Sequence, residues 1–281
     1  MVARWFLPFL TAVGVTFAAT AHTGLAPAVR LVDAANPLAG HSLYVDPTSA
    51  AMAAAHRATP PSAELDAIAN TPQAFWIDGA VPSAAIGRYV NGAQAAGSMP
   101  VLAVYAIPHR DCGSFAAGGF GSAADYREWI DGVAATVGAS PAAFIVEPDA
   151  LDMADCLSGG QREERFSLIR HAVDTFTRNP AAAVYIDGGH SRWLSAGEIA
   201  NRLNQVGVDH ARGFSLNTSN FYSTDEEIGY GEAVSGLTNG SHYVVDTSPR
   251  RVHTPTPTCG LSGPATPTDP ADAANRGRVT S

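Results

Sequence analysis

Hydrophobic and polar positions repeat in a regular way through the middle of the chain, from about residue 40 to residue 248. Short runs of apolar and β-branched residues are followed by longer segments in which apolar residues recur at i, i+3 and i+4. The runs return roughly every 30 to 40 residues, the length of one strand plus one helix. The pattern predicts strands at residues 42–45, 74–77, 100–105, 143–146, 183–186, 213–216 and 243–245.

Two of the intervening segments carry an apolar stripe with the spacing of a buried helix face. The first stripe consists of Tyr126, Trp129, Ile130, Val133, Ala134 and Val137, and the second of Phe166, Ile169, Ala172, Val173 and Phe176. Ser122 is a suitable N-cap for the first helix, and Tyr126 is its first expected core contact. We interpret both stripes as core-facing.

Strands that alternate with helices fit either an open doubly wound sheet or a closed barrel. Polar residues fall at or just past the end of each predicted strand, namely Asp46, Asp78, Asp111, Asp149, Asp187, Asn217 and Asp246. Any one of them could be a turn residue or a helix cap. Because the carboxyl ends of barrel strands meet at one rim, where active sites are built, the repeated placement favours an α/β fold of the (β/α) barrel type. The absence of GxGxxG after the first strand argues against a dinucleotide-binding sheet.

The charge balance narrows the range of partners. The sequence has 17 Lys and Arg against 26 Asp and Glu, for a net charge of −9. An acidic surface disfavours a nucleic-acid groove. A barrel enzyme that acts on phosphorylated metabolites is also disfavoured, because the acidic charge opposes such substrates and the phosphate-binding glycines are missing.

The two ends of the chain differ in composition from the middle. Residues 1–21 have a basic start, an apolar run and a small-x-small cleavage motif at Ala19–Thr20–Ala21, which predicts a secretory signal peptide and a secreted protein. An uncleaved membrane anchor is the alternative. Residues 22–35 form a leader segment. Residues 249–281 are rich in Pro and Thr and lack aromatic residues, so we expect a disordered tail.

The three cysteines, Cys112, Cys156 and Cys259, lack the spacing of a zinc site. In an exported protein an odd number leaves one cysteine unpaired or intermolecular, so we expect at most one intramolecular bridge.

Two segments carry the most specific chemistry. One runs from Tyr105 to Cys112 after the third predicted strand and delivers Asp111; the other contains Glu147–Pro148–Asp149 after the fourth. Glycoside hydrolysis requires paired carboxyl groups, since one must protonate the departing glycosidic oxygen. A nearby carboxylate raises the pKa of its partner and keeps it protonated near neutral pH.

At these residues the chain resembles glycoside hydrolase family 6, the inverting cellulases, and especially the shorter actinobacterial endoglucanases. Four motifs of that family appear in order: the 105–112 loop, Glu147 to Asp149, Asp187–Gly–Gly–His190, and Asn217–Thr–Ser–Asn220. The resemblance covers residues 36–248. It implies a distorted, TIM-like (β/α) barrel and a secreted hydrolase that cleaves β-1,4-glucan with inversion.

The resemblance also assigns roles to individual residues. Asp149 matches the general acid, Asp111 its electrostatic partner, and Tyr105 the residue that presses on the sugar ring. Positions that contact or order the substrate match Trp76, Asp187, His190, Trp193 and Asn220. Core packing is the alternative for the two tryptophans. The resemblance further implies a disulfide between Cys112 and Cys156.

The match weakens after residues 246–248. The last strand of the family, its second disulfide context and its proposed catalytic base have no counterpart in this sequence, and Cys259 matches nothing. We therefore expect a catalytic domain over residues 36–248 that lacks its C-terminal part, with low stability and little or no activity. A frameshifted gene, or a natural linker that lost its module, would account for the tail. A non-catalytic glucan-binding remnant is the alternative function.

The remaining expectations concern partners. The resemblance implies a β-1,4-glucan polysaccharide or oligosaccharide as substrate. We expect no cofactor, no metal, no nucleic acid and no membrane association after signal cleavage, and a monomeric chain.

Overall fold

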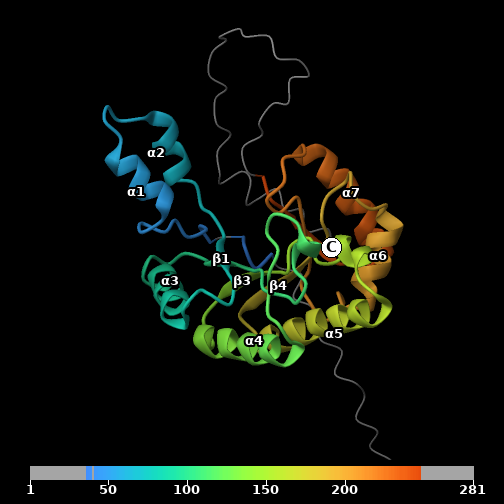
Figure 1. Cartoon of the computed structure of the whole chain (residues 1–281). Helices are drawn as coiled ribbons and strands as arrows, with labels where there is room; N and C mark the ends of the chain where they lie inside the picture. Colours follow the sequence, from blue (N-terminus) through green and yellow to red (C-terminus); the bar gives the residue numbers. More distant parts are fainter. Residues whose placement is uncertain (1–35, 40, 248–281) are drawn as a thin grey trace, which may run out of the picture. The chain divides into compact units, whose positions relative to one another are not determined.

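The computed structural model describes residues 36–39 and 41–247 (Figure 1). The predicted signal peptide and leader, Cys259 and the tail lie outside these residues. The strands are β1 (Phe75–Ile77), β2 (Val101–Val104), β3 (Ala142–Val146), β4 (Ala182–Asp187), β5 (Gly213–Leu216) and β6 (His242–Val245). The helices are α1 (Ala50–Arg57), α2 (Ala63–Ala69), α3 (Ser83–Ala95), α4 (Ala123–Val137), α5 (Gly159–Phe176), α6 (Ala196–Gln205) and α7 (Thr224–Leu237), with the short 3₁₀ helices η1 (Asp111–Gly113) and η2 (Asp152–Cys156).

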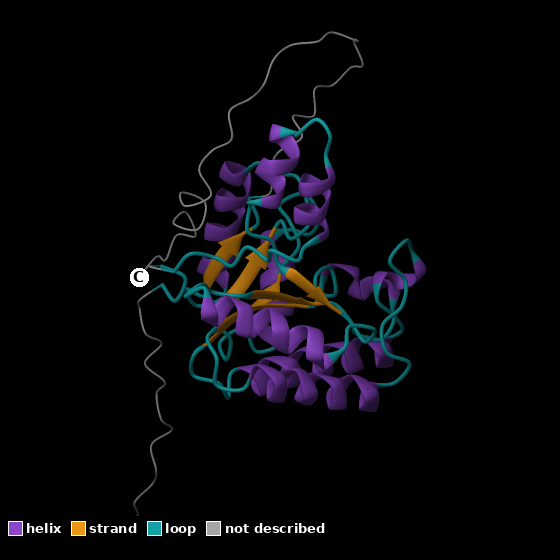
Figure 2. Ribbon diagram, turned by 90° about the vertical axis from the view of Figure 1, so that its left-hand side faces the viewer, coloured by secondary structure: helices purple, strands orange, loops and turns teal. Residues whose placement is uncertain are grey.

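The six strands form one parallel sheet in the order β1-β2-β3-β4-β5-β6. Each strand pairs with the next in the chain, and from β1 onward a helix precedes each new strand, as in a (β/α) barrel. Figure 2 shows the strands enclosed by helices. Among the described residues β1 and β6 do not pair with each other, so the sheet is not closed. The predicted fold class, an incomplete (β/α) barrel, is confirmed.

The two faces of the sheet are built from different side chains. On β3, Phe144 and Val146 belong to the main core, whereas Ala143 and Ile145 belong to a smaller cluster on the opposite face. This alternation follows from the two-residue period of a strand. Because both faces are covered, all of β3 is buried, and its sequence is a continuous apolar run.

The two helices with predicted stripes occupy the places expected for them. In α4, Tyr126 and Ile130 are fully buried, and the Ser122 side chain accepts a hydrogen bond from the Asp125 amide, which confirms the predicted N-cap. In α5, the Phe176 ring stacks on Phe144 of β3, with 4.2 Å between ring centroids. The contact fixes α5 against the sheet.

One predicted strand is wrong. Residues 42–45 do not form a strand; Leu43 alone makes an isolated parallel bridge to Met99. The chain leaves the sheet at once, because Asp46 accepts hydrogen bonds from the Thr48 amide and hydroxyl and begins a turn into α1. Because this turn follows directly, the apolar run is too short to form a continuous set of strand hydrogen bonds with a neighbouring strand.

No helix within the described ranges is long and apolar enough to cross a membrane.

Candidate active site

The loops at the carboxyl end of the sheet hold an unusual backbone. In the described part of the chain, every non-glycine residue with positive φ except Asn239 lies in a loop that follows β2, β3 or β5. They include Asp111 (φ 56°), Glu147 (φ 52°) and Asp149 (φ 67°). Such conformations are costly for residues other than glycine and gather at functional sites. The strained backbone therefore lies at the carboxyl end of the strands, where the positions of the aspartates in the sequence predicted the site.

Asp149 is held in place through its backbone. Its amide donates a hydrogen bond of 3.0 Å to Oδ2 of Asp187, the last residue of β4. The same oxygen accepts from the Gly189 amide at 3.1 Å, and Oδ1 accepts from the Ser215 hydroxyl of β5 at 3.1 Å. Asp187 is thus an anchor, buried at 1% exposure, which joins the loops after β3 and β4. Its role in ordering the site stays a prediction.

The acidity of these two carboxyl groups is shifted by their surroundings. Burial, followed by the charge of Asp111, raises the pKa of Asp149 to about 6. Burial, followed by the charge of Asp149, raises the pKa of Asp187 to about 7. Desolvation and like charge both disfavour the carboxylate form. A carboxyl group with a pKa near 6 can be protonated in mildly acidic solution and can donate that proton.

Asp111 lies on a separate loop that curls back on itself. Its Oδ2 accepts a hydrogen bond of 2.6 Å from the Ala116 amide. Arg110 ties down the same loop, because its guanidinium donates to the carbonyls of Tyr105 at 2.7 Å and Ala116 at 2.8 Å. The Arg110 guanidinium also lies 4.6 Å from the centroid of the Tyr105 ring. The predicted pair Asp111 and Asp149 therefore shares one rim with Tyr105.

Tyr105 is flanked by these charges. Burial, then the charges of Asp149 and Asp111, raise the pKa of its phenol to about 12, so the hydroxyl stays protonated. Its ring meets Trp76 of β1 edge to face, with centroids 5.4 Å apart. Trp76 is 39% exposed, so it is not a core residue. An exposed indole beside Tyr105 provides an apolar surface at the rim.

A second aromatic group lies after β4. The His190 ring is 5.3 Å from Trp193 and 4.3 Å from Tyr222, centroid to centroid. Trp193 is 37% exposed, whereas His190 is buried, and this burial lowers the pKa of His190 below its ordinary value. A neutral imidazole can both donate and accept a hydrogen bond.

The segment that carries His190 and Trp193 is fixed by two carboxylates of α7. The fully buried Glu227 accepts from the Ser191 amide at 3.1 Å and its hydroxyl at 2.7 Å. Glu226 pairs with Arg192 at 2.7 Å. The predicted Asn220 lies in the loop after β5, where its side chain donates to the Thr218 carbonyl at 3.1 Å.

Glu147 has a structural role. It is 1% exposed, and its carboxylate accepts from the Ala106 and Ile107 amides and from the Tyr126 hydroxyl, at 3.1, 3.1 and 3.0 Å. Burial nevertheless raises its pKa to about 7. The side chain connects the loops after β2 and β3 and leaves no oxygen facing the rim without a partner.

Two further links join the loops that carry Asp111 and Asp149. Cys112 and Cys156 form a disulfide with a Cα–Cα distance of 6.2 Å, which confirms the predicted pair. The buried Arg165 of α5 donates to the carbonyls of Ala150 at 3.1 Å and His109 at 2.7 Å. Both loops are therefore held by a covalent bond and a guanidinium.

Not every predicted rim residue belongs to this group. Asp46 bonds within its own turn. Asp78 accepts from the Ala80 amide at 3.0 Å within a turn, and its Oδ2 also lies 3.7 Å from the Arg110 guanidinium of the Asp111 loop. Asp246 accepts from the Ser219 amide at 3.1 Å and supports the loop after β5. Asp46 follows the turn interpretation that the sequence left open, whereas Asp78 and Asp246 each contact a loop other than their own.

Sequence reasoning missed Tyr222, Arg165 and Asp152. Tyr222 directly follows the Asn217–Phe221 segment, and it is Tyr222, not the 63% exposed Phe221, that contacts His190. An aromatic pair next to a rim motif was a usable signal. Arg165 lies in α5 and Asp152 begins η2, and charged residue types do not indicate burial, so only the fold shows that both are buried.

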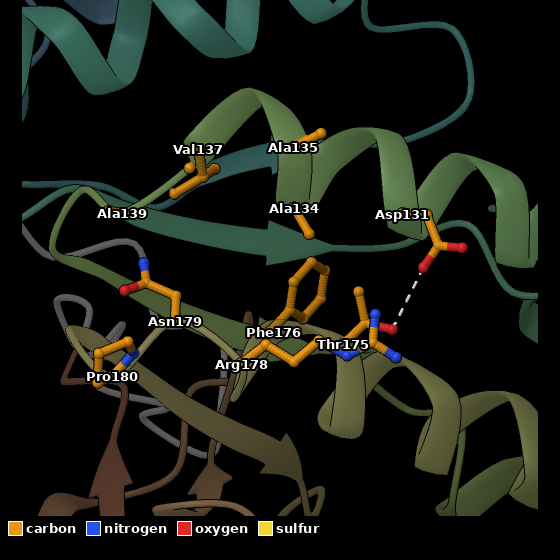
Figure 3. A pocket seen from close by; sticks show the side chains of 11 residues that line it. Asp131, Ala134, Ala135, Val137, Ala139, Thr175, Phe176, Arg178, Asn179 and Pro180 are labelled. Atoms are coloured by element: carbon orange, nitrogen blue, oxygen red, sulfur yellow. Dashed lines mark hydrogen bonds between the residues drawn. The ribbon is translucent and has the colours of Figure 1, made fainter.

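A separate cavity of about 380 Å³ lies at the other end of the sheet (Figure 3). It is lined by the last turns of α4 and α5 and by the loops that lead into β3 and β4. Figure 3 shows Asp131 and Thr175 joined by a hydrogen bond of 3.3 Å at its edge. None of the predicted site residues lines this cavity.

In the part of the chain that the structure describes, no group of three or more His, Cys, Asp or Glu residues is arranged to hold a metal ion.

Comparison with known proteins agrees with this geometry. The family described as "Glycosyl hydrolases family 6" matches residues 38–260. Endoglucanase A of Cellulomonas fimi is 43% identical over 211 residues, 73% of this chain and 46% of that protein. Endoglucanase 1 of Streptomyces halstedii is 38% identical over 247 residues, 78% of this chain and 77% of that protein.

The similarity extends to three dimensions. The endoglucanase Cel6 of Mycobacterium tuberculosis, solved in complex with methyl-cellobiosyl-4-deoxy-4-thio-β-D-cellobioside, superposes with a TM-score of 0.76 at 66% identity. The match covers 80% of this chain and 78% of that structure. This chain spans about half the length of the C. fimi relative. From these matches and from the carboxyl pair at the rim, the chain belongs to glycosyl hydrolase family 6.

Proposed function

We propose that this protein hydrolyses β-1,4-glucan with inversion at the anomeric carbon, with Asp149 as the general acid. The observation that carries the proposal is the half-buried Asp149 carboxyl, whose pKa burial and Asp111 raise to about 6. Endoglucanases similar to this chain, and the cellooligosaccharide analogue bound to the M. tuberculosis relative, support a glucan substrate.

In the proposed reaction, protonated Asp149 gives its proton to the glycosidic oxygen while the bond from C1 to that oxygen breaks. The bonding electrons leave with the oxygen, and positive charge develops on the sugar ring. Water adds to C1 from the opposite face and releases a proton, which inverts the configuration.

Asp111 and Tyr105 act next to this step. The charge of Asp111 favours the protonated form of Asp149 and, at the same time, a positively charged sugar ring. Tyr105 keeps its proton and lies against Trp76. It can press on the sugar ring whose glycosidic bond is cleaved.

The exposed aromatic surfaces would contact the sugar chain. Trp76 and Trp193 suit the apolar faces of pyranose rings, and the neutral His190 and Asn220 suit their hydroxyl groups. The proposal includes secretion and action as a monomer, as expected from the sequence.

The test is the release of reducing sugar from carboxymethylcellulose by the protein and by Asp149→Asn. We expect the substitution to lower the rate by about 10² to 10⁴, the contribution of a general acid. Equal rates for both proteins would overturn the assignment, and binding to insoluble cellulose without turnover would indicate a glucan-binding protein.

Two controls separate loss of the acid from loss of the fold. An aryl cellobioside with a good leaving group needs little acid assistance, so Asp149→Asn should retain far more of its rate on that substrate. Carbon-13 NMR of the aspartate carboxyls should show Asp149 titrating near pH 6. The titration should move to lower pH in Asp111→Asn.

A further inference from the structure

Asp152 is a buried carboxyl group for which the proposed mechanism has no use. It begins η2, three residues after Asp149, and is 3% exposed. Neither of its oxygens has a hydrogen-bond partner among the described residues. Buried carboxylates without partners are rare, because the charge loses its hydration and gains nothing in return. The charge state of this group therefore matters for the structure around it.

The Asp152 carboxyl lies directly against the turn at Gly189. A Cβ atom placed on Gly189 would come within 2.6 Å of the Asp152 Cγ, so only a hydrogen separates the glycine from the carboxyl. Gly189 has a φ of 64°, which glycine adopts at little cost. The packing of Asp152 thus requires glycine at this position, and the backbone of the Gly189 turn packs against the Asp152 carboxyl group.

The Gly189 turn connects Asp152 to the acid. The Gly189 amide donates to Oδ2 of Asp187, and the same oxygen accepts from the Asp149 amide. The Gly189 carbonyl accepts from the Asn217 amide at 2.7 Å. A shift of Gly189 would therefore move the anchor of Asp149.

The charged and titratable groups around Asp152 come from four elements. Asp187 of β4 and Asp149 of its own loop are like charges, Arg202 of α6 is the opposing charge, and Tyr230 of α7 completes the set. The Tyr230 hydroxyl donates to the Leu194 carbonyl at 2.8 Å.

The guanidinium of Arg202 is already engaged. It donates to Glu198 at 2.6 Å, Asp155 at 2.7 Å and the Leu151 carbonyl at 2.7 Å. Its donors are directed at groups other than the Asp152 carboxyl. Burial, then the charges of Asp187 and Asp149, hold the pKa of Asp152 well above its usual range.

We propose that Asp152 is a positioning residue: its uncharged carboxyl supports the Gly189 turn that anchors the acid, and ionisation of Asp152 opens that turn. The role of the anchored group as an acid rests on the proposed function. Asparagine has the same shape as a protonated aspartate and cannot ionise, so Asp152→Asn is the informative substitution.

The first test compares the unfolding equilibria of the protein and Asp152→Asn from pH 4 to pH 8. An aspartate with a raised folded-state pKa stabilises fully below its unfolded pKa, and this contribution is lost as pH rises. The ratio of the folding equilibrium constant of Asp152→Asn to that of the unsubstituted protein should therefore rise by up to about tenfold per pH unit above pH 4. Curves that stay parallel would overturn the proposal.

Asp155→Asn is the matched control within the same 3₁₀ helix. The hydrogen bond from Arg202 lowers the pKa of Asp155, so its contribution is present at neutral pH and lost in acid. The Asp155 variant should be less stable than the protein at pH 7 and approach it as pH falls. The two asparagine variants are thus expected to diverge in opposite directions.

The second test follows the turn itself by hydrogen exchange at pH 8. The amides of Asp149 and Gly189, both donors to Asp187, should exchange several-fold more slowly in Asp152→Asn than in the protein. The amides of Ala106 and Ile107, which donate to Glu147, should be the same in both. Equal exchange at all four amides would contradict the opening of the turn.

If Asp152→Asn does not fold, carbon-13 NMR of the unsubstituted protein decides. The Asp152 carboxyl should titrate at a higher pH than the Asp155 carboxyl of the same 3₁₀ helix, and an Asp152 signal that titrates below that of Asp155 would overturn the proposal. Since these measurements require no turnover, failure of the glucan hydrolysis assay and failure of this inference are distinguishable.

Discussion

The two ends of the parallel sheet differ in how deeply they bury carboxyl side chains. At the carboxyl end, Glu147, Asp152 and Asp187 are at most 3% exposed, and they sit beneath loops with positive φ. At the amino end, the cavity of Figure 3 is bordered by Asp131, whose side chain is 55% exposed. Asp131 contacts Thr175 and His171 at 3.3 Å each.

The comparison indicates that a cavity alone does not make a site for acid catalysis. The amino-end cavity has volume and a carboxylate, yet that carboxylate is exposed to water, so its contacts are those of an ordinary surface group. The three carboxyl-end groups are removed from water, and backbone amides orient Glu147 and Asp187. Desolvation raises the pKa of a carboxyl group and so allows it to hold a proton near neutral pH, and hydrogen bonds from amides oppose this shift.

The largest effect that would sharpen this contrast is expected from Glu147→Leu. The substitution leaves the Ala106 and Ile107 amides and the Tyr126 hydroxyl buried without an acceptor. Each unsatisfied donor costs about 1–3 kcal/mol, so the free energy of unfolding should fall by about 3 kcal/mol or more. Denaturant unfolding measures the loss. Tyr126→Phe, which removes one donor, is the control and should cost about 1 kcal/mol.

The next effect concerns the covalent link at the carboxyl end. Replacing both Cys112 and Cys156 by serine opens a loop with a sequence separation of 44. We expect a loss of about 2–4 kcal/mol in the free energy of unfolding. A reductant should lower the melting temperature of the unsubstituted protein to that of the double variant. A double variant that melts at the original temperature would show that the bridge contributes nothing.

A pH-dependent effect is expected from Asp187. Its folded pKa of about 7 lies above its ordinary value of 3.8, so the stabilisation it gives is complete below pH 4 and is lost as pH rises to 7. Relative to Asp187→Asn, the unsubstituted protein should lose up to about 1.4 kcal/mol per pH unit across this window. Unfolding curves at each pH measure the difference. A difference that moves the other way would mean that Asp187 is ionised in the fold.

The smallest effect is expected at the amino end. Asp131→Ala removes an exposed carboxylate and two contacts of 3.3 Å, so stability should change by no more than about 0.5 kcal/mol. Glucan hydrolysis should be unchanged. A large loss in either measurement would erase the distinction between the two ends.

Much of the fold was predictable because periodicity reports burial directly. The runs that became β1 to β6 were located to within two residues, and the stripe through Tyr126 and Ile130 became the buried face of α4. The predicted strand at residues 42–45 was wrong, because an apolar run does not show whether a partner strand continues alongside it. The turn at Asp46 ended the pairing after Leu43.

The candidate site was predictable in part. Asp111, Asp149 and Asp187 were recognisable from their positions after strands and from family motifs, and the structure brings them to one rim. Which rim aspartates remain turn residues, as Asp46 does, and which contact a second loop, as Asp78 does, depended on how the loops fold. The contact of Tyr222 with His190 depended on how the loops after β4 and β5 meet.

The sequence by itself determined the strand and helix order, the family, and the residues able to carry acid chemistry, because these follow from side-chain period and local motif. Tertiary structure decided which carboxyl groups lose their water. Asp149 and Asp152 lie three residues apart, yet one is half-buried at the rim and the other packs beneath Gly189. Desolvation is a property of everything packed around a group, so no local stretch of sequence contains it.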